Sequence, residues 1–276
     1  MKNKPLVSVV MSVYNGEKFL NEAIECVLHQ TYENLEFIII NDGSSDSSSS
    51  IIRKYASLDD RILLIDHKNK GLTKSLVIGC QLAKGEYIAR QDVDDYSMLS
   101  RLQEQVYYLE KYKKVSLIGT WYEVFGCNQA ANIYQPVDSD YLLRKDLFSR
   151  NPFCHSSTMF RNVSYQNTDG YNTKYRAAQD LDLWFSIARI GNLGMVEKVL
   201  VKRRVHGDAI SQSNLAWVQV FNSFKIRISN IHKIGSVKNL FLFLFSTSYH
   251  IMMTLFPKSI SNKLFLTVKF FRNISK

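Results

Sequence analysis

Short apolar runs alternate with amphipathic segments through the first hundred residues, and this alternation constrains the possible fold more than any other feature of the sequence. The runs are rich in β-branched side chains and predict strands, whereas the segments between them carry apolar residues at helical spacing. The predicted strands are residues 6–14, 35–42, 61–67 and 86–92, and the predicted helices are residues 17–32, 48–58 and 72–85. Continuously apolar strands joined by helices form right-handed βαβ units, so we predict an α/β protein whose mainly parallel central sheet is covered on both faces.

Polar side chains follow each of these predicted strands. Because ligands of an open parallel sheet bind beyond the carboxyl ends of its strands, these side chains should meet along one edge. They are Ser12, Tyr14 and Asn15 after the first strand, Asp42 after the second, Asn69 after the third, and Asp92 and Asp94 after the fourth. The sequence has neither a Gly-x-Gly-x-x-Gly turn after the first strand nor a Gly-Lys-Ser/Thr phosphate loop, so another group must neutralise any phosphate that binds there.

The stretch "RQDVDDYS" (residues 90–97) places three carboxylates, Asp92, Asp94 and Asp95, within four positions. Like charges this close raise one another's pKa unless a cation or strong hydrogen-bond donors compensate them. Carboxylate oxygens suit a hard divalent ion such as Mg²⁺ or Mn²⁺, which would also neutralise a phosphate. Two interpretations remain open from the residues alone: a divalent metal site on Asp92 and Asp94, or a solvated acidic turn at the end of a strand.

The net charge of +10 on these 276 residues is concentrated at one end of the chain. No Asp or Glu follows Asp208, whereas nine of the 35 Lys and Arg residues do, so the preceding part carries 26 basic against 25 acidic side chains. This distribution is not the footprint of a nucleic-acid-binding domain, and we expect no nucleic-acid partner. The four cysteines lie far apart without a Cys-x-x-Cys pair, which predicts reduced thiols rather than a disulfide framework or a zinc site.

Residues 115–212 show a less regular pattern. Within them "QDLDLW" (residues 179–184) opens a predicted helix, with Asp180 near its start. A carboxylate near the start of a helix interacts favourably with the helix dipole and stabilises the helix by up to about 1 kcal/mol. Two interpretations of Asp180 therefore remain open: a carboxylate that only stabilises the helix, or a reactive group.

Several stretches, in their order along the chain, resemble the family 2 glycosyltransferases, which have the GT-A fold. They are "VSVVMSVYNGEKFLNEAIECVLHQTYENLEFIIINDGSSD", "NKGLTKSL", "AKGEYIARQDVDD", "HSSTMF", "QDLDLW" and "RRVHGDAIS". The resemblance covers residues 5–212 and implies a GT-A type, Rossmann-like sandwich over residues 1–212. Residues 1–114 would bind a nucleotide-diphospho-sugar and residues 115–212 the acceptor, and transfer would invert the anomeric carbon.

The resemblance also implies roles for individual residues. The family's functional positions fall on Asp92 and Asp94 (the Asp-x-Asp motif), Asp42 (uracil contact), Tyr14 (nucleoside contact), Asp180 (catalytic base) and His206 (metal or diphosphate contact). We expect Asp94 to be the direct metal ligand and Asp92 to contact the ribose or the metal shell, while Ser12, Asn15 and Asn69 contact the donor. Many members have Glu before the base, where this chain has Gln179.

The chemistry of such a transfer explains why these groups are needed. A divalent ion, Mn²⁺ or Mg²⁺, stabilises the negative charge that develops on the diphosphate leaving group. The Asp42 carboxylate can accept a hydrogen bond from the imide N–H of uracil or thymine, which cytosine lacks, so a UDP-sugar or dTDP-sugar is expected, with UDP preferred. Inversion in one displacement requires a base on the opposite side to take the acceptor's proton, as Asp180 would do.

The last part of the chain, residues 213–276, is predicted to be a helical, basic, membrane-associating tail. Residues 240–256 are apolar but marginal in length for a bilayer, and residues 260–274 place apolar and basic side chains on opposite helical faces, as in a helix lying on an anionic membrane. A helical hairpin packed on the domain is the alternative. The chain start predicts a strand rather than a signal peptide. We therefore expect peripheral attachment to the cytoplasmic face of the membrane and a lipid-linked saccharide acceptor.

Two other functions remain open from the sequence. A nucleotidyltransferase would need a triphosphate turn rich in Gly, Arg and Lys near the first strand, which "SVYNGEKF" (residues 12–19) does not supply. A nucleotide-sugar binding protein without catalysis would bind donor and metal but never cleave the donor. The preferred hypothesis is a glycosyltransferase of surface polysaccharide synthesis.

Overall fold

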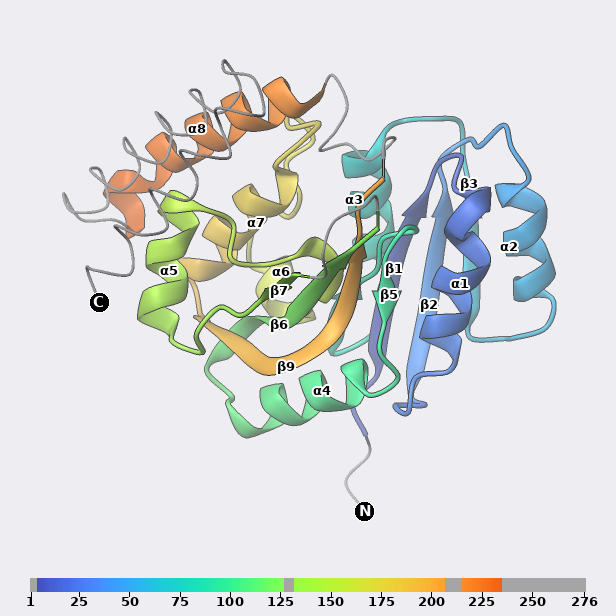
Figure 1. Cartoon of the computed structure of the whole chain (residues 1–276), viewed down its shortest axis with the longest axis horizontal. Helices are drawn as coiled ribbons and strands as arrows, with labels where there is room; N and C mark the ends of the chain where they lie inside the picture. Colours follow the sequence, from blue (N-terminus) through green and yellow to red (C-terminus); the bar gives the residue numbers. More distant parts are fainter. Residues whose placement is uncertain (1–3, 127–131, 207–214, 235–276) are drawn as a thin grey trace.

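The structure, a computed structural model, describes residues 4–126, 132–206 and 215–234. Its described part contains a nine-stranded sheet of order β3-β2-β1-β4-β8-β6-β9-β5, with β7 paired to β6 (Figure 1). The strands are β1 (Val7–Val13), β2 (Leu35–Asn41), β3 (Ile62–Asp66), β4 (Tyr87–Arg90), β5 (Tyr96–Ser97), β6 (Val115–Phe125), β7 (Asn132–Tyr134), β8 (Met159–Arg161) and β9 (Asn192–Arg204). The helices are α1 (Glu17–Leu28), α2 (Ser48–Ala56), α3 (Leu72–Leu82), α4 (Arg101–Lys111), α5 (Asp140–Ser149), the 3-10 helix η1 (His155–Ser157), α6 (Asn162–Gln166), α7 (Gln179–Ala188) and α8 (Leu215–Ile234).

The strand directions confirm the predicted α/β class with a mainly parallel sheet. Strands β3, β2, β1 and β4 pair in parallel, and β8 lies antiparallel between β4 and β6. Strand β9 is parallel to β6, while β5 and β7 run antiparallel to their partners. Six strands therefore point the same way. The sheet continues without a break from residues 1–114 into residues 115–212, so both parts contribute strands to one sheet.

Helices cover both faces of the sheet because its strands are apolar on both sides. Along β1, Val9 and Met11 belong to a core that includes apolar side chains of α1, α2 and α4, whereas Val10 belongs to a second core shared with α3, α5, α7 and α8. This alternation is the two-residue period of a strand. The close approach of α3 depends on Gly79, where an added Cβ would lie 2.5 Å from Cγ1 of Val10.

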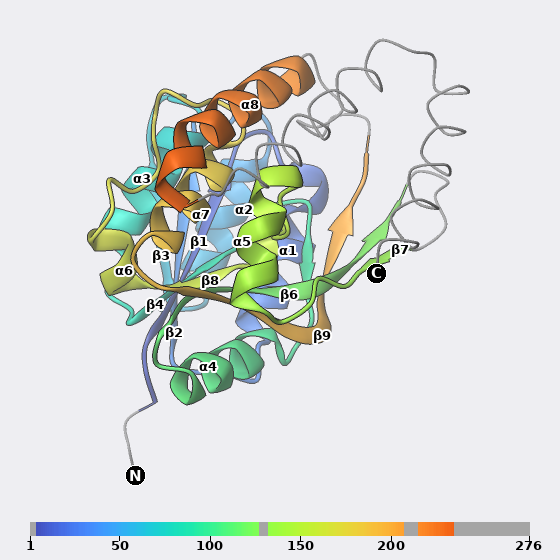
Figure 2. The ribbon, with the colours of Figure 1, turned by 90° about the vertical axis from the view of Figure 1, so that its left-hand side faces the viewer.

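Helix α8 lies at the start of the segment that the sequence predicted to be a helical tail, and it packs beside α5 and α7 (Figure 2). Ile226 is fully buried in the second core, and Arg227 Nε donates to the carbonyl of Leu147 in the last turn of α5 at 2.9 Å. Asn222 Nδ2 donates to the carbonyl of Ala177, just before α7, at 2.9 Å. The expected tail boundary at residue 212 and the segments 240–256 and 260–274 lie outside the described residues.

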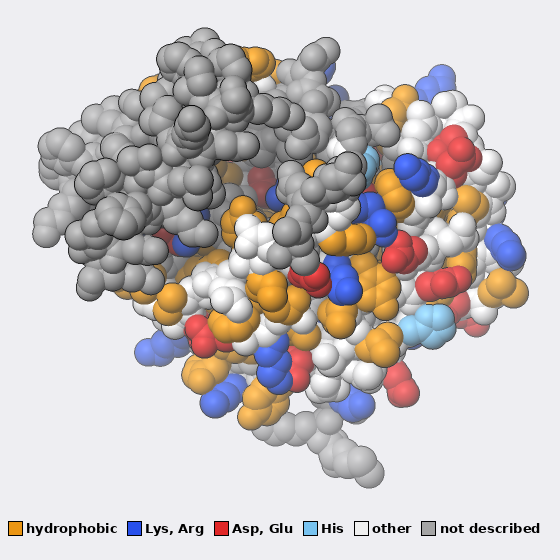
Figure 3. Space-filling model, viewed as in Figure 1, with side chains coloured by type: hydrophobic (Ala, Val, Ile, Leu, Met, Phe, Trp, Pro, Cys, Tyr) orange, Lys and Arg blue, Asp and Glu red, His pale blue; other side chains and the backbone are white. Residues whose placement is uncertain are grey.

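Charged side chains are interspersed over the described surface. On the face shown in Figure 3, Lys and Arg side chains alternate with Asp and Glu. Among the described helices, none combines the length and apolar character needed to cross a membrane.

Candidate active site

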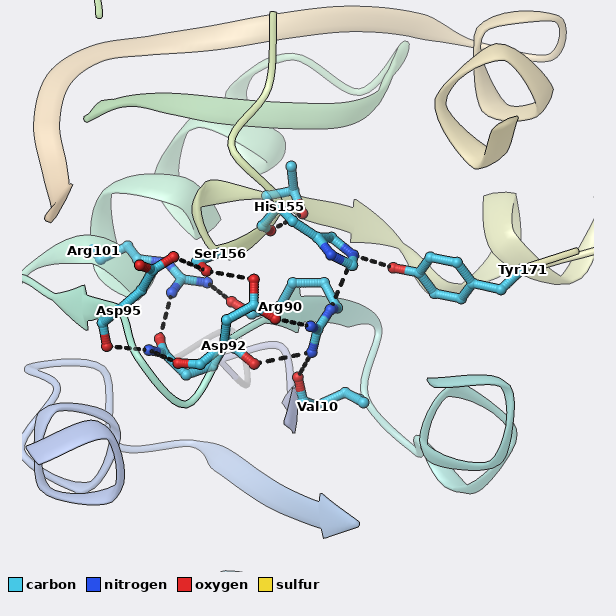
Figure 4. Close-up of polar contacts among 10 residues, drawn as sticks. Val10, Arg90, Asp92, Asp95, Arg101, His155, Ser156 and Tyr171 are labelled. Atoms are coloured by element: carbon cyan, nitrogen blue, oxygen red, sulfur yellow. Dashed lines mark hydrogen bonds and ion pairs between the residues drawn. The ribbon is translucent and has the colours of Figure 1, made fainter. Parts of the chain in front are cut away.

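The acidic run lies where the sequence placed it, in the turn that joins β4 to β5. Asp92 is the second residue after β4, and its Oδ1 forms an ion pair with Arg90 at 2.5 Å. The Ser156 hydroxyl lies 2.9 Å from Asp92 Oδ2 and 2.5 Å from Asp95 Oδ2, so it links two of the three carboxylates (Figure 4). Asp95 Oδ1 also accepts from the backbone N–H of Arg204 at 2.9 Å. The turn is therefore held by donors from η1 and from β9.

The three carboxylates have different environments and different pKa shifts. Burial favours the neutral form of Asp92, but the charge of Arg90, together with His155, the Ser156 hydrogen bond and Arg203, outweighs it and lowers the pKa of Asp92. Burial and the negative charge of Asp92 together raise the pKa of Asp94. Burial, followed by the charges of Asp94 and Asp92, raises the pKa of Asp95 to about 8. The cluster thus carries more negative charge than its protein donors compensate, which is the condition that favours binding of a cation.

Arg90 is the buried cation that organises this cluster. Its guanidinium donates to the backbone carbonyls of Val10 and Gln91 as well as to Asp92. Its Nε donates to Nε2 of His155 at 3.1 Å, and the Tyr171 hydroxyl lies 2.8 Å from the same nitrogen (Figure 4). An Arg Nε always carries a proton, so His155 Nε2 must be an acceptor and the imidazole neutral. Burial and the charge of Arg90 agree with this, because they lower the pKa of His155 to about 3.

A second buried guanidinium, that of Arg101 in α4, forms hydrogen bonds on both sides of the turn between β4 and β5. It donates to the Ser97 hydroxyl at 2.5 Å, to Gln91 Oε1 at 3.1 Å and to the carbonyl of Arg90 at 2.6 Å. Burial lowers the pKa of Arg101 to about 10, which leaves it charged at neutral pH. The backbone on both sides of the acidic run is thereby fixed by side chains from a separate helix.

Asp94 and His206 meet as the family resemblance implied. His206 Nε2 lies 2.9 Å from Asp94 Oδ2, and the two side chains are 18% and 26% exposed. The described residues contain no cluster of three or more His, Cys, Asp or Glu side chains arranged to hold a metal. A Mg²⁺ or Mn²⁺ ion that completes its shell with substrate phosphates and water needs only one or two carboxylates. Asp94 with Asp92 fits that smaller donor set, and their mutual repulsion supplies the electrostatic reason for an ion.

Asp42 is almost fully buried, with 1% exposure, at the end of β2. Its two carboxylate oxygens accept the backbone N–H groups of Lys70 and Gly71 at 2.7 and 2.9 Å, and His67 Nδ1 lies 3.3 Å away. Asp42 therefore holds the loop between β3 and α3. The neighbouring Gly43 has a φ of 72°, and an added Cβ there would lie 2.6 Å from the backbone nitrogen of Asn69, so the two loops touch.

The polar residues after β1 reach the same edge of the sheet. Asn15 adopts a φ of 50°, and its Oδ1 accepts the backbone N–H of Ser45 at 2.8 Å, which ties the end of β1 to the loop after β2. The Tyr14 side chain is 54% exposed, and Asn69 is exposed as well. Ser12 is half-buried near the end of β1. The structure thus places these four residues at the carboxyl end of the parallel strands, as predicted, but does not test what they bind.

Asp180 lies in the first turn of α7, directly after Ala178, whose left-handed φ of 62° is uncommon for a residue with a side chain. Asn151 Nδ2 donates to Asp180 Oδ2 at 2.7 Å. Burial raises the pKa of Asp180, and the negative charge of Asp92 raises it further. Asp180 therefore belongs to the same electrostatic site as the acidic run. Its neighbour Gln179 is buried, where Glu would place a charge that is costly to bury.

Sequence reasoning assigned no role to Arg90, Asn151, His155 or Ser156, although Arg90, Asn151 and Ser156 contact predicted site residues and His155 contacts Arg90. The "HSSTMF" stretch was noted only as part of the resemblance. Ser156 is 64 residues from Asp92 in the chain, so nothing local in the sequence links them. Only the fold brings these side chains together.

Comparisons with known proteins agree with this geometry. The sequence model of the family described as "Glycosyl transferase family 2" matches residues 8–168. A "Putative glycosyltransferase EpsE" of Bacillus subtilis (strain 168) is 37% identical over 225 residues, which cover 79% of each chain. Two solved structures share the fold at low sequence identity. S. aureus TarS 1–349 in complex with UDP has a TM-score of 0.68 at 13% identity and covers 89% of this chain and 72% of its own. The mannosyltransferase PcManGT from Pyrobaculum calidifontis in complex with GDP-Man and Mn²⁺ has a TM-score of 0.66 at 15% identity and covers 98% and 81%.

Proposed function

The chain belongs to glycosyl transferase family 2, and we propose that it is an inverting enzyme that moves a sugar from a UDP-sugar to a hydroxyl group of a saccharide acceptor. The observation that carries this proposal is that one short segment contacts both Asp180 and the acidic run, since Asn151 donates to Asp180 and Ser156 donates to Asp92. A carboxylate with a raised pKa lies within electrostatic reach of Asp92, on an element from residues 115–212. This is the arrangement expected of a general base that faces a bound donor.

The donor would lie over the carboxyl ends of β1, β2 and β4. Asp42 and the loop it holds would contact the uracil, with Tyr14 against the nucleoside and Ser12, Asn15 and Asn69 around it. UDP in the structurally similar TarS complex supports this choice of nucleotide. The alternative donor is a GDP-sugar, since the PcManGT complex contains GDP-Man. In our proposal residues 1–114 hold the donor and residues 115–212 the acceptor.

Asp94, Asp92 and His206 would hold a divalent ion, Mn²⁺ or Mg²⁺, whose charge stabilises the diphosphate leaving group. Mn²⁺ in the PcManGT complex supports this proposal. Arg90 and Ser156 keep both oxygens of Asp92 in fixed positions, so Asp92 is oriented before the donor arrives. Asp94, which has the less compensated charge, remains the residue proposed to contact the ion directly.

Asp180 would accept the proton of the acceptor hydroxyl as the new C–O bond forms. The bond between the anomeric carbon and the diphosphate breaks in the same displacement, and its electron pair stays on the diphosphate oxygen. Asn151 orients the Asp180 carboxylate by donating to its Oδ2. Because the pKa of Asp180 is raised, its carboxylate is a stronger base than an exposed one.

We also propose that the enzyme is peripherally attached to the cytoplasmic face of the membrane and takes a lipid-linked acceptor in polysaccharide synthesis. Helix α8 buries Ile226 and Asn230 and exposes large apolar side chains on its opposite face. Trp217, Phe221 and Ile228 are 51%, 68% and 44% exposed, and their spacing of four and seven residues aligns them along one side of the helix. Helix α8 belongs to the segment 209–276, whose sequence has nine basic and no acidic residues, and exposed aromatic side chains in such a segment suit an anionic lipid surface.

The decisive experiment is a donor panel of UDP-, dTDP-, GDP- and CDP-sugars, assayed by release of nucleoside diphosphate with and without Mn²⁺. Release from a UDP-sugar that increases with Mn²⁺ and with a saccharide acceptor supports the proposal. The anomeric configuration of the product, measured by NMR, tests inversion directly. Donor binding without cleavage under any condition would instead indicate a nucleotide-sugar binding protein, and retention of configuration would exclude Asp180 as the base of a single displacement.

A further inference from the structure

Three consecutive basic residues close β9, and they differ in what they contact. Successive side chains of a strand point to opposite faces, so Lys202 and Arg204 share one face while Arg203 lies on the other. Arg203 is opposite Val124 in the register of β6 and β9. Its face also carries Val201 and Tyr122, which form a small core with Cys154.

The two neighbours of Arg203 are paired, whereas Arg203 is not. Lys202 Nζ lies 3.8 Å from Glu123, and Arg204 forms an ion pair with Glu22 and donates to the carbonyl of Asp94 at 3.1 Å. Within residues 4–126, 132–206 and 215–234, the Arg203 side chain forms no hydrogen bond and no ion pair. It is only half-buried, so it remains accessible to a ligand. The N–H groups of the Arg203 guanidinium therefore remain available to donate to a ligand.

The surroundings of Arg203 indicate which ligand that is. Arg203 is opposite Val124 of β6, and the next residue, Arg204, donates its backbone N–H to Asp95, so Arg203 lies between the acidic run and β6. Cys154, on the same face, begins the short segment that leads to Ser156, which contacts Asp92. The other guanidinium groups beside the acidic run are already used: Arg90 donates to Asp92, His155 and two backbone carbonyls, Arg101 donates to Ser97, Gln91 and the carbonyl of Arg90, and Arg204 pairs with Glu22.

We propose that Arg203 binds the diphosphate of the donor from the side of β9, opposite the proposed metal, and holds it as the leaving group departs. This inference rests on the proposed function, since it takes the acidic run to be the diphosphate site. An Arg fork donates to two phosphate oxygens at once, and such charge-assisted pairs are among the strongest hydrogen bonds in proteins. Arg203 would thus supply fixed positive charge where negative charge accumulates.

The test compares Arg203→Gln and Arg203→Lys with the matched control Lys202→Gln, which removes a charge from the adjacent position on the other face. Binding of UDP and of uridine is measured by calorimetry with Mn²⁺ present. We expect Arg203→Gln to weaken UDP binding about 10- to 100-fold, the range for a hydrogen bond between charged groups, and to leave uridine binding unchanged. Arg203→Lys should recover part of the loss, because it keeps the charge without the fork. Lys202→Gln should bind UDP as the wild type does.

The outcomes separate this inference from the function on which it rests. If wild-type protein binds GDP rather than UDP, the same variants are compared with GDP and guanosine, and the expected pattern is the same. Wild-type affinity for the diphosphate in Arg203→Gln would overturn the inference while leaving the transferase intact. An increased KM for the acceptor with unchanged diphosphate affinity would also overturn it, since Arg203 would then contact the acceptor. Equal losses for nucleoside and nucleoside diphosphate, with a lowered Tm, would show a structural role only.

Discussion

Asn151 offers the sharpest test of Asp180 as the general base, because it touches the carboxylate without belonging to the donor site. Its Nδ2 donates to Asp180 Oδ2 at 2.7 Å, and this hydrogen bond favours the ionised form. We predict that Asn151→Ala raises the pKa of Asp180. Asp180 must be ionised to accept a proton, so activity is lost as the pH falls through that pKa. The variant should therefore shift the acidic limb of the pH profile of kcat/KM to higher pH.

The size of the shift follows from the strength of the lost bond. A hydrogen bond to a charged group contributes about 1.5–3 kcal/mol, and one pKa unit corresponds to about 1.4 kcal/mol. The complete loss of the bond would raise the pKa by about 1 to 2 units. Asp180 is half-buried, so water replaces part of the lost interaction, and we expect a shift near the lower end of this range. Asp180→Asn, which removes the base itself, should reduce kcat by roughly 10²–10⁴-fold without such a shift.

The assay is release of nucleoside diphosphate with saturating donor and varied acceptor between pH 4.5 and pH 8, in steps of about half a unit. Asn222→Ala is the matched control, because Asn222 donates to the carbonyl of Ala177 and holds the same region without touching Asp180. Asp182→Asn is the second control, since Asp182 points about 200° away from Asp180 on a helix. An unshifted limb in Asn151→Ala, together with full activity in Asp180→Asn, would refute the assignment of the base.

The remaining predictions address the ion, the nucleobase and the membrane. Asp94→Asn should weaken UDP binding in the presence of Mn²⁺ at least tenfold. It should leave Tm unchanged or raise it, because the substitution removes charge repulsion within the acidic cluster. Full activity of the wild type after treatment with a chelator would contradict the metal assignment. Asp42→Asn should cost about 1–3 kcal/mol of unfolding free energy, measured by denaturant titration, and weaken UDP binding, since one of two backbone N–H groups loses its acceptor. Equal wild-type affinity for UDP and CDP would argue against recognition of the base by Asp42. The double variant Trp217→Ser, Phe221→Ser should bind anionic vesicles about tenfold more weakly in co-sedimentation. The control Tyr141→Ser, which alters an aromatic side chain that is 74% exposed on α5, should bind them as the wild type does. Unchanged vesicle binding by the double variant would exclude α8 as the face that docks on the membrane.

Periodicity predicted the strands and helices of the first hundred residues because those strands are buried on both faces and therefore continuously apolar. The parallel pairing of β1 with β2 and β4 agrees with the right-handed βαβ units predicted from that pattern, whereas its register was not predicted. Strands β8 and β6 lack such a pattern, and their antiparallel pairing depends on the sheet already formed by β4. Helix α8 lies in the segment that was predicted to be helical, but its packing against α5 and α7 was not the preferred prediction, because its exposed face is apolar and reverses the amphipathic pattern that normally predicts a packed helix.

The acidic side chains of the site were predictable, whereas their partners were not. Asp92, Asp94 and Asp180 stand at strand and helix ends, where position alone suggests chemistry. Arg90 has no such feature, since a single Arg after an apolar run usually snorkels to water, and here it is fully buried instead. Its role depends on contacts with His155, 65 residues away, which no local pattern encodes.

The short segment from Asn151 to Ser156 joins the two chemical functions of the site. Asn151 at one end holds the proposed base, and Ser156 at the other end holds Asp92 of the acidic run. Pro152 restricts the backbone between them, and the 3-10 turn of η1 fixes the far end, so the segment has few conformations available. A general base must lie within hydrogen-bonding reach of the acceptor hydroxyl while that hydroxyl faces the anomeric carbon, so an error of about 1 Å in the position of the base relative to the donor greatly reduces the rate. Because one short segment contacts both carboxylates, the separation of Asp180 from Asp92 depends on six consecutive residues rather than on two independent loops.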